Sequence, residues 1–216
     1  MLAFWRSTVG KKIVMAITGV VMIAFLIGHV AGNLLVFRGA AALDGYSAFL
    51  KRESFALWSV RALLLVAVVL HVVAAAQLAI LARTARPERY ARAEPQAATI
   101  ASRTMRIGGV FIAAFVVFHL LHLTSGTIRP APFEETRVYD NVVGGFRIWW
   151  VSAMYVVAMI ALGLHLFHGG WSFLRTLGLS RPSGAPLHRP LAAVLALGIW
   201  AGFTSIPLAI FFGLAR

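Results

Sequence analysis

Histidine is the residue type in this chain most able to do chemistry, because the sequence holds seven histidines and no cysteine. Six of them lie in long apolar stretches: His29 in LIGHVAGN, His71 in VVLHVVAAAQ, His119 and His122 in FHLLHLTSG, and His165 and His168 in GLHLFHGG. An ionisable side chain is costly in the hydrocarbon of a membrane, so it usually faces a bundle interior and serves a cofactor, an ion or a proton. The lack of cysteine excludes iron–sulfur clusters ligated by this chain, thiol catalysis and covalent haem attachment.

The elements that position these histidines are five apolar stretches, each long enough to cross about 30 Å of hydrocarbon as a helix. The 216 residues are 60% hydrophobic and 12% charged, with a mean hydropathy of +0.84. We place the spans at residues 13–37, 57–81, 105–124, 148–168 and 191–214. The first is too long for a cleavable signal peptide, so we expect it to stay. The sequence therefore predicts an all-α integral membrane protein, with residues 1–216 as one transmembrane domain.

The net charge of +13 is distributed as membrane topology requires. With the N-terminus inside, the inner segments hold twelve Lys and Arg against two acids, Glu88 and Glu94. The outer segments hold eight against five acids. The positive-inside rule therefore predicts a cytoplasmic N-terminus and an outer C-terminus. No nucleic-acid partner is expected, and the inner basic loops could also dock a cytoplasmic protein.

Four of the histidines sort into two depths. At 1.5 Å per residue, His29 and His119 fall roughly 20–25 Å from the inner ends of their spans. His71 and His165 fall about 15 Å and 5 Å from the inner ends of theirs. Two histidines from different helices at similar depth can supply both axial ligands of a b-type haem. We therefore predict a bundle enclosing two haems b, whose filled axial positions suit electron transfer.

His122 and His168 each follow a predicted ligand by three residues, on a similar helix face one turn nearer the surface. We predict that they contact a haem propionate or a quinone. His188, in a proline-rich inner connection, is expected to be solvated.

Over nearly its whole length the sequence resembles the cytochrome b membrane-anchor subunit of succinate dehydrogenase and fumarate reductase, in its single-chain, five-helix, two-haem form. The resemblance lies in GKKIVMAITG, HVAGNLLVFRG, SRTMRIGG and HLFHGGWSFLRTLG. It implies haem iron ligation by His71 with His165 near the soluble subunits, and by His29 with His119 far from them. It also implies a flavoprotein subunit and an iron–sulfur subunit on the cytoplasmic side, which carry FAD, the clusters and the dicarboxylate chemistry.

Further expectations rest on the same resemblance. The chain would pass electrons between the iron–sulfur subunit and a membrane quinone, with menaquinone favoured, in the respiratory chain and tricarboxylic acid cycle. It would be a multi-pass protein among the lipids of a bacterial inner membrane, and the whole complex could form a higher oligomer. Glu53 in FLKRES best matches the acid of an outer quinone site, with Asp44 second. An inner site near Ser102 and Arg103 is the alternative.

Two other functions are compatible with the histidines. One is the two-haem cytochrome b subunit of another quinone-linked enzyme, such as a hydrogenase or formate dehydrogenase, although the motifs of the first and fourth spans disfavour it. The other is a proton-coupled transporter with a histidine relay. That alternative predicts no haem, and usually broken helices or inverted repeats, which the sequence does not contain.

Overall fold

The structure is a computed structural model that describes residues 2–85, 100–178 and 188–215. All regular secondary structure in the described part is helical, and this part contains no strand. Its elements are α1 (Leu2–Arg6), α2 (Thr8–Asn33), η1 (Leu34–Arg38), α3 (Ala40–Arg52), α4 (Ser54–Thr84), α5 (Ile100–His119), η2 (Leu120–Thr124), α6 (Val138–Phe146), α7 (Trp149–Thr176) and α8 (His188–Phe211).

Five of these helical segments are long and apolar enough to cross a membrane, which confirms the predicted number. They are α2 with η1, α4, α5 with η2, α7 and α8. Most extend beyond the predicted limits; α4, with 31 residues, is about 46 Å long at 1.5 Å per residue. A helix longer than the hydrocarbon is thick must tilt or project from it. The chain is thus an all-α, multi-pass membrane protein.

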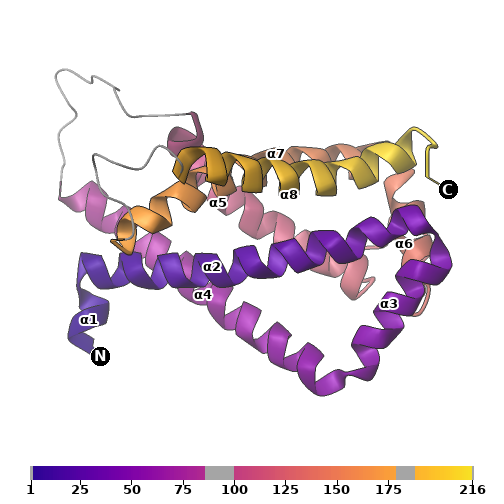
Figure 1. Cartoon of the computed structure of the whole chain (residues 1–216), viewed down its shortest axis with the longest axis horizontal. Helices are drawn as coiled ribbons and strands as arrows, with labels where there is room; N and C mark the ends of the chain where they lie inside the picture. Colours follow the sequence, from indigo (N-terminus) through magenta and orange to yellow (C-terminus); the bar gives the residue numbers. More distant parts are fainter. Residues whose placement is uncertain (1, 86–99, 179–187, 216) are drawn as a thin grey trace.

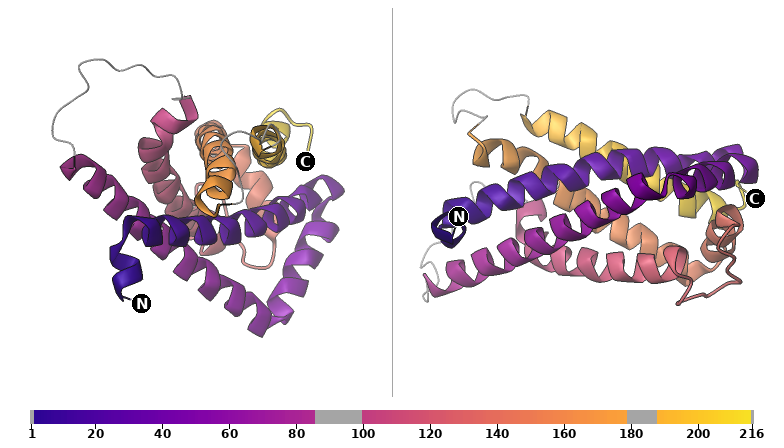
Figure 2. Two further views of the ribbon diagram at one scale, coloured as in Figure 1. Left: turned by 60° about the vertical axis from the view of Figure 1, so that its left-hand side comes forward. Right: turned by 90° about the horizontal axis from the view of Figure 1, so that it is seen from below.

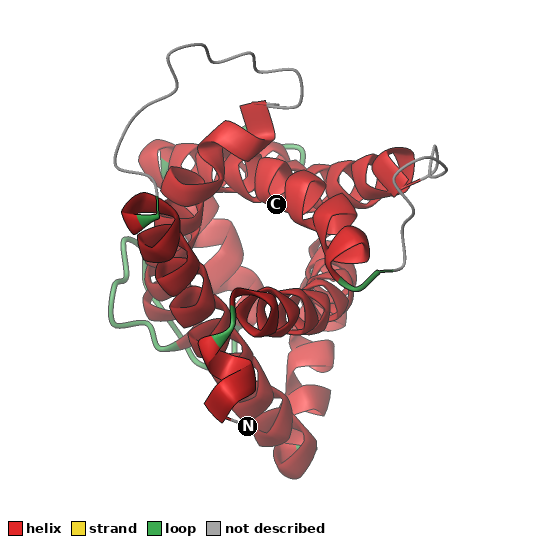
Figure 3. Cartoon of the chain, turned by 90° about the vertical axis from the view of Figure 1, so that its left-hand side faces the viewer, coloured by secondary structure: helices red, strands yellow, loops and turns green. Residues whose placement is uncertain are grey.

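The five spans form an elongated bundle with the chain termini at opposite ends (Figure 1). We call the end that bears α1 the N-side and the end that bears α6 the C-side. α7 packs against α8 and α5, and α2 packs against α4 and, less extensively, α7 and α8. Viewed along the bundle, these helices surround a common centre (Figure 3). α4 diverges from α2 toward the C-side, where α3 joins their ends (Figures 1 and 2).

Small residues set how closely the helices approach. A Cβ added at Gly170 of α7 would lie 3.2 Å from the Cβ of Ala192 in α8. One added at Gly202 of α8 would lie 2.5 Å from Cγ2 of Val30 in α2. Without a hydrophobic force between helices in lipid, close van der Waals packing of this kind drives their association.

Helix α6 closes the C-side of the bundle. The predicted spans leave residues 125–147 as a connection between the third and fourth helices. The structure forms the further helix α6 within this connection, and its side chains pack into the largest buried cluster of the described residues. The apolar stretch is short, so it gains a buried position only from tertiary contacts. The backbone N–H of Tyr139 donates to Asp44 Oδ1 at 2.8 Å, and the hydroxyl of Ser152 donates to the Phe146 carbonyl at 2.6 Å. These bonds tie α6 to α3 and α7.

The N-side begins with a capped turn. Ser7 precedes α2, and its hydroxyl accepts a hydrogen bond from the backbone N–H of Gly10 at 2.8 Å, as an N-cap does. Lys11 is buried, and its ammonium donates to the carbonyls of Trp5 and Arg6 at 2.8 Å and 3.1 Å. Its cation thereby satisfies carbonyls at the end of α1, where a positive charge is favourable.

Candidate functional site

The structure brings together His71 of α4 and His165 of α7, which we call the N-side pair. Their ring centroids are 6.3 Å apart, and their planes are inclined by 54°. His29 of α2 and His119 of α5 form the C-side pair, with ring centroids 5.9 Å apart and planes inclined by 82°. These are the same two pairs that the depths predicted from the sequence put together.

The two pairs are well separated along the bundle. Tyr155 of α7 contacts His119, and it precedes His165 by ten residues. At 1.5 Å per residue, this places the pairs about 15 Å apart along α7.

The ring separations fit two imidazoles on opposite sides of one metal ion. A bond between a transition metal and an imidazole nitrogen is about 2 Å long, so the two nitrogens lie about 4 Å apart and the ring centroids about 6 Å apart. Within the described ranges, no group of three or more histidine or acidic side chains gathers as a metal site. Two imidazoles leave most positions of a metal unfilled, so a bound group such as a porphyrin would have to complete its coordination.

The backbones on either side of each pair leave room between them. In the part of the chain that the structure describes, neither α4 with α7 nor α2 with α5 packs closely along its length. Each pair of imidazoles therefore reaches across a separation between helices. This arrangement suits a flat group held between two axial ligands.

Hydrogen bonds determine which nitrogen of His71 is available. Its Nδ1 lies 3.1 Å from the Met15 carbonyl oxygen and 3.1 Å from Oγ1 of Thr18, both in α2. A carbonyl only accepts, so Nδ1 carries the proton and donates it. Nε2 is then the nitrogen with the free lone pair. Metal-bound histidines are commonly fixed in this way, with the second ring nitrogen donating to a backbone carbonyl.

Glycines lie beside both rings of the N-side pair. A Cβ built at Gly19 of α2 would lie 3.6 Å from Cε1 of His71, and one at Gly109 of α5 would lie 3.8 Å from Cε1 of His165. A methyl group would therefore just touch each ring, and a longer side chain would occupy the space beside it. Neither glycine is among the site residues predicted from the sequence, although glycine in an apolar helix is itself a signal of close approach.

Tyr155 joins His119 to His122. Its hydroxyl lies 3.2 Å from Nδ1 of His119 and 3.0 Å from Nδ1 of His122. A phenol can accept from one ring and donate to the other. The π-helical turn η2 follows His119 and carries His122, whose side chain is 3% exposed and contacts the C-side core. Such turns are frequent at functional sites. Sequence reasoning missed Tyr155, whose signal is a phenol in the middle of an apolar span.

His29 has mostly aromatic neighbours. Its ring stacks on Phe25 at 5.0 Å and lies 5.5 Å from Phe203 of α8. The amide nitrogen of Asn33, from the HVAGN motif, donates to the His29 carbonyl at 2.7 Å and lies 3.3 Å from Nδ1. The motif thus brings the asparagine onto the histidine one turn before it.

The N-side of the bundle gathers hydrogen-bond donors one turn beyond His165. His168 packs against Trp171, with ring centroids 5.4 Å apart. The guanidinium carbons of Arg175 and Arg189 lie 5.4 Å and 4.9 Å from the same indole.

Several buried nitrogens in this region have no hydrogen-bond partner within the described residues: Nδ1 of His165, His168 and His188, and Nε1 of Trp171. His188 begins α8 and is partly buried, in contrast to its expected solvation. Because arginine and tryptophan only donate, this end of the bundle suits an acceptor such as a carboxylate.

The acids considered for a quinone site lie apart from these clusters. Glu53 is exposed at the corner between α3 and α4 and makes no ion pair with any described residue. Asp44 accepts from the backbone of α6, which gives it a structural role. Ser102 and Arg103 lie in the first turn of α5 on the N-side.

Comparisons with family models, curated proteins and solved structures give no match to this chain.

Proposed function

We propose that the chain is a membrane-embedded b-type cytochrome with two bis-histidine haem sites. His71 and His165 would hold one haem b, and His29 and His119 the other. The observation that carries this proposal is the geometry of the two imidazole pairs. The ring centroids within each pair are 6.3 Å and 5.9 Å apart, and the two helices that supply each pair do not pack closely against each other. A haem bound there would supply a reversible one-electron carrier with both axial positions filled.

The residues around each pair support this role. His71 directs its proton to the Met15 carbonyl, which leaves Nε2 free to ligate. Nε2 of His119 is likewise free to ligate when Nδ1 of His119 donates to the Tyr155 hydroxyl and that hydroxyl donates to His122. His168, Trp171 and nearby guanidinium groups can donate to a propionate on the N-side.

More specifically, we propose that the chain is the membrane-anchor subunit of a succinate dehydrogenase or fumarate reductase. Two motifs support this proposal. In HxxGN the Asn33 amide lies within hydrogen-bond distance of the His29 ring, and in HxxHGxWS the His168 ring packs beside Trp171. In this proposal the N-side faces the cytoplasm of a bacterium and docks the iron–sulfur and flavoprotein subunits. Electrons pass between the iron–sulfur subunit and a membrane quinone, with menaquinone favoured.

The first test is haem content. The purified chain should show two haems b by pyridine haemochrome and by a dithionite-reduced minus oxidised spectrum. His71→Ala and His119→Ala should each lose one haem, with different spectral components removed. A well-folded chain that carries no haem after expression with added haem precursor would refute the cytochrome proposal.

A matched pair of glycine variants tests the position of the N-side haem. Gly109→Leu places a side chain beside the His165 ring, whereas a Cβ at neighbouring Gly108 meets nothing within 4 Å. Haem content should fall toward one per chain in Gly109→Leu and stay at two in Gly108→Leu. Equal haem content in the two variants would contradict this placement.

The anchor function needs a separate test. The chain should co-purify with a flavin-containing and an iron–sulfur subunit from its native membrane, and succinate should reduce its haem in that complex. A haem-loaded chain associated instead with hydrogenase or formate dehydrogenase subunits would keep the cytochrome and refute the anchor assignment.

A further inference from the structure

A groove runs along the N-side half of α5, and Arg83 from the last turn of α4 borders one end of it. These two helices do not pack closely along their lengths in the described part of the chain. The groove has a volume of about 540 Å³, within the range of ligand sites in proteins. Its lining residues are Arg83, Arg106, Ile107, Val110, Phe111 and Ala114.

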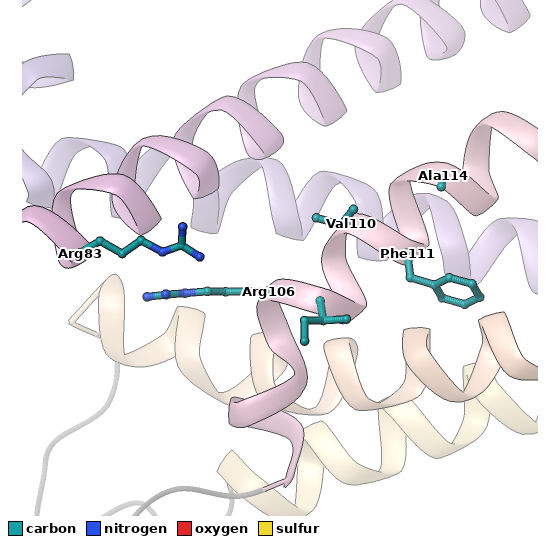
Figure 4. A pocket seen from close by; sticks show the side chains of 6 residues that line it. Arg83, Arg106, Val110, Phe111 and Ala114 are labelled. Atoms are coloured by element: carbon teal, nitrogen blue, oxygen red, sulfur yellow. The ribbon is translucent and has the colours of Figure 1, made fainter. Parts of the chain in front are cut away.

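The groove is cationic at one end and apolar along the rest. Arg83 and Arg106 extend toward each other at its N-side end, and Phe111 and Ala114 lie farther along α5 (Figure 4). From Arg106 to Ala114 the helix rises about 12 Å, so the apolar floor runs from the charged end into the membrane. This division between charge and hydrocarbon matches an amphipathic ligand with an anionic head.

The two arginines are free to bind an anion, as far as the described residues show. They are exposed, and neither forms an ion pair with a described residue. The acids within the described ranges all belong to the C-side segments. Two guanidinium groups directed at one point attract an anion that can accept several hydrogen bonds, and a phosphate does so.

The groove is distinct from the N-side pair. Arg106, Val110 and Ala114 are spaced by four residues and so share one face of α5. Gly109, which borders His165, lies about 100° around the helix from Val110. The residues that line the groove include neither His71 nor His165, so a ligand there is separate from that pair.

We propose that this groove binds an anionic phospholipid, with its phosphate between Arg83 and Arg106 and an acyl chain along Val110, Phe111 and Ala114. The exposed apolar floor favours a lipid over free phosphate: Ile107 and Val110 are 80% and 74% exposed. An acyl chain covers such a surface, whereas inorganic phosphate covers only the charged end. The proposal does not depend on haem.

Native mass spectrometry of the full-length chain in detergent, titrated with phosphatidylglycerol or phosphatidylcholine, tests the site. Each arginine near an anionic headgroup contributes roughly a fivefold factor in affinity, so Arg83→Gln/Arg106→Gln should weaken phosphatidylglycerol binding about 25-fold. Phosphatidylcholine binding should change little. The matched control is Arg6→Gln/Lys12→Gln, which removes two exposed N-side charges outside the groove and should have less than about a threefold effect.

A second variant tests the apolar floor. Val110→Trp fills the groove without changing charge and should also weaken phosphatidylglycerol binding. Equal losses in the two double variants would show diffuse attraction and overturn the proposal, as would no loss in Arg83→Gln/Arg106→Gln. Displacement of the lipid by inorganic phosphate at the same concentration would identify a phosphate site without an acyl-chain role. If Arg83→Gln/Arg106→Gln loses haem together with lipid, the arginines belong to the cofactor site, and the lipid proposal is overturned.

Discussion

Tyr155 offers a direct test of the C-side network, because its hydroxyl serves two histidines. Tyr155→Phe removes only that oxygen and keeps the ring packed against Phe115 and Phe146. Nδ1 of His119 and Nδ1 of His122 would then each lose a partner. Both rings lie in or next to the C-side core, where water cannot readily replace the hydroxyl.

The expected loss can be estimated from the number of bonds. A hydrogen bond between transmembrane helices contributes about 0.6 kcal/mol on average and up to about 1.7 kcal/mol. Two such bonds give a decrease of roughly 1–3 kcal/mol in the free energy of unfolding. The measurement is reversible unfolding in mixed micelles, with sodium dodecyl sulfate titrated against a mild detergent.

Tyr46→Phe is the matched control, since the Tyr46 hydroxyl makes no hydrogen bond with a described residue and packs beside Gly32. It should change the free energy of unfolding by less than about 0.5 kcal/mol. A double-mutant cycle with His122→Leu should give a coupling energy of at least about 0.5 kcal/mol. If Tyr155→Phe unfolds like Tyr46→Phe, and the cycle shows no coupling, the hydroxyl does not bridge the two rings.

Two further predictions concern packing at the ends of the bundle. Gly202→Ala places a Cβ 2.5 Å from a methyl of Val30 and should lower the free energy of unfolding by about 1–3 kcal/mol; Gly198→Ala, with nothing within 4 Å, should not lower it. A thermal melt of both variants would decide, and equal melting temperatures would contradict the contact. Lys11→Met removes the donor to the last carbonyls of α1, so trypsin should cleave after Arg6 faster than it does in the control Lys12→Met. The Lys12 side chain is exposed. Equal cleavage rates would show that the ammonium does not fix α1.

The spans and the grouping of histidines could be predicted because both follow from local quantities. A long apolar run needs only its length to be assigned to a membrane helix. The rise of a helix then gives the depth of His29, His71, His119 and His165 from their positions in the sequence. The structure groups the same four rings by proximity.

The C-side elements could not be predicted in the same way. Residues 138–146 are too few to cross a membrane, and they follow a proline-containing stretch that is typical of a loop. Their burial depends on Asp44, which lies 95 residues before Tyr139. Contacts at that separation leave no periodic pattern in a single sequence.

The burial of His122 and its contact with Tyr155 also depend on tertiary packing, and so they could not be predicted from the sequence. Regular α-helical spacing places His122 one turn nearer the surface than His119. The π turn at Leu120–Thr124 alters that spacing and buries His122 against the C-side core. A change of helical pitch over five residues depends on tertiary packing and is not visible in the sequence.

The contacts of α2 and α7 have a consequence for how the two histidine pairs respond to one another. α2 carries His29 and also accepts the proton of His71, while α7 carries His165 and also bonds His119 through Tyr155. Each of these helices is thus a member of both sites. A ligand that shifts α2 or α7 on binding at one pair would therefore be expected to change the affinity at the other, and any such change is reciprocal. If the two pairs hold haem as proposed, the shared helices α2 and α7 make coupled loading of the two pairs the expected outcome, rather than independent filling.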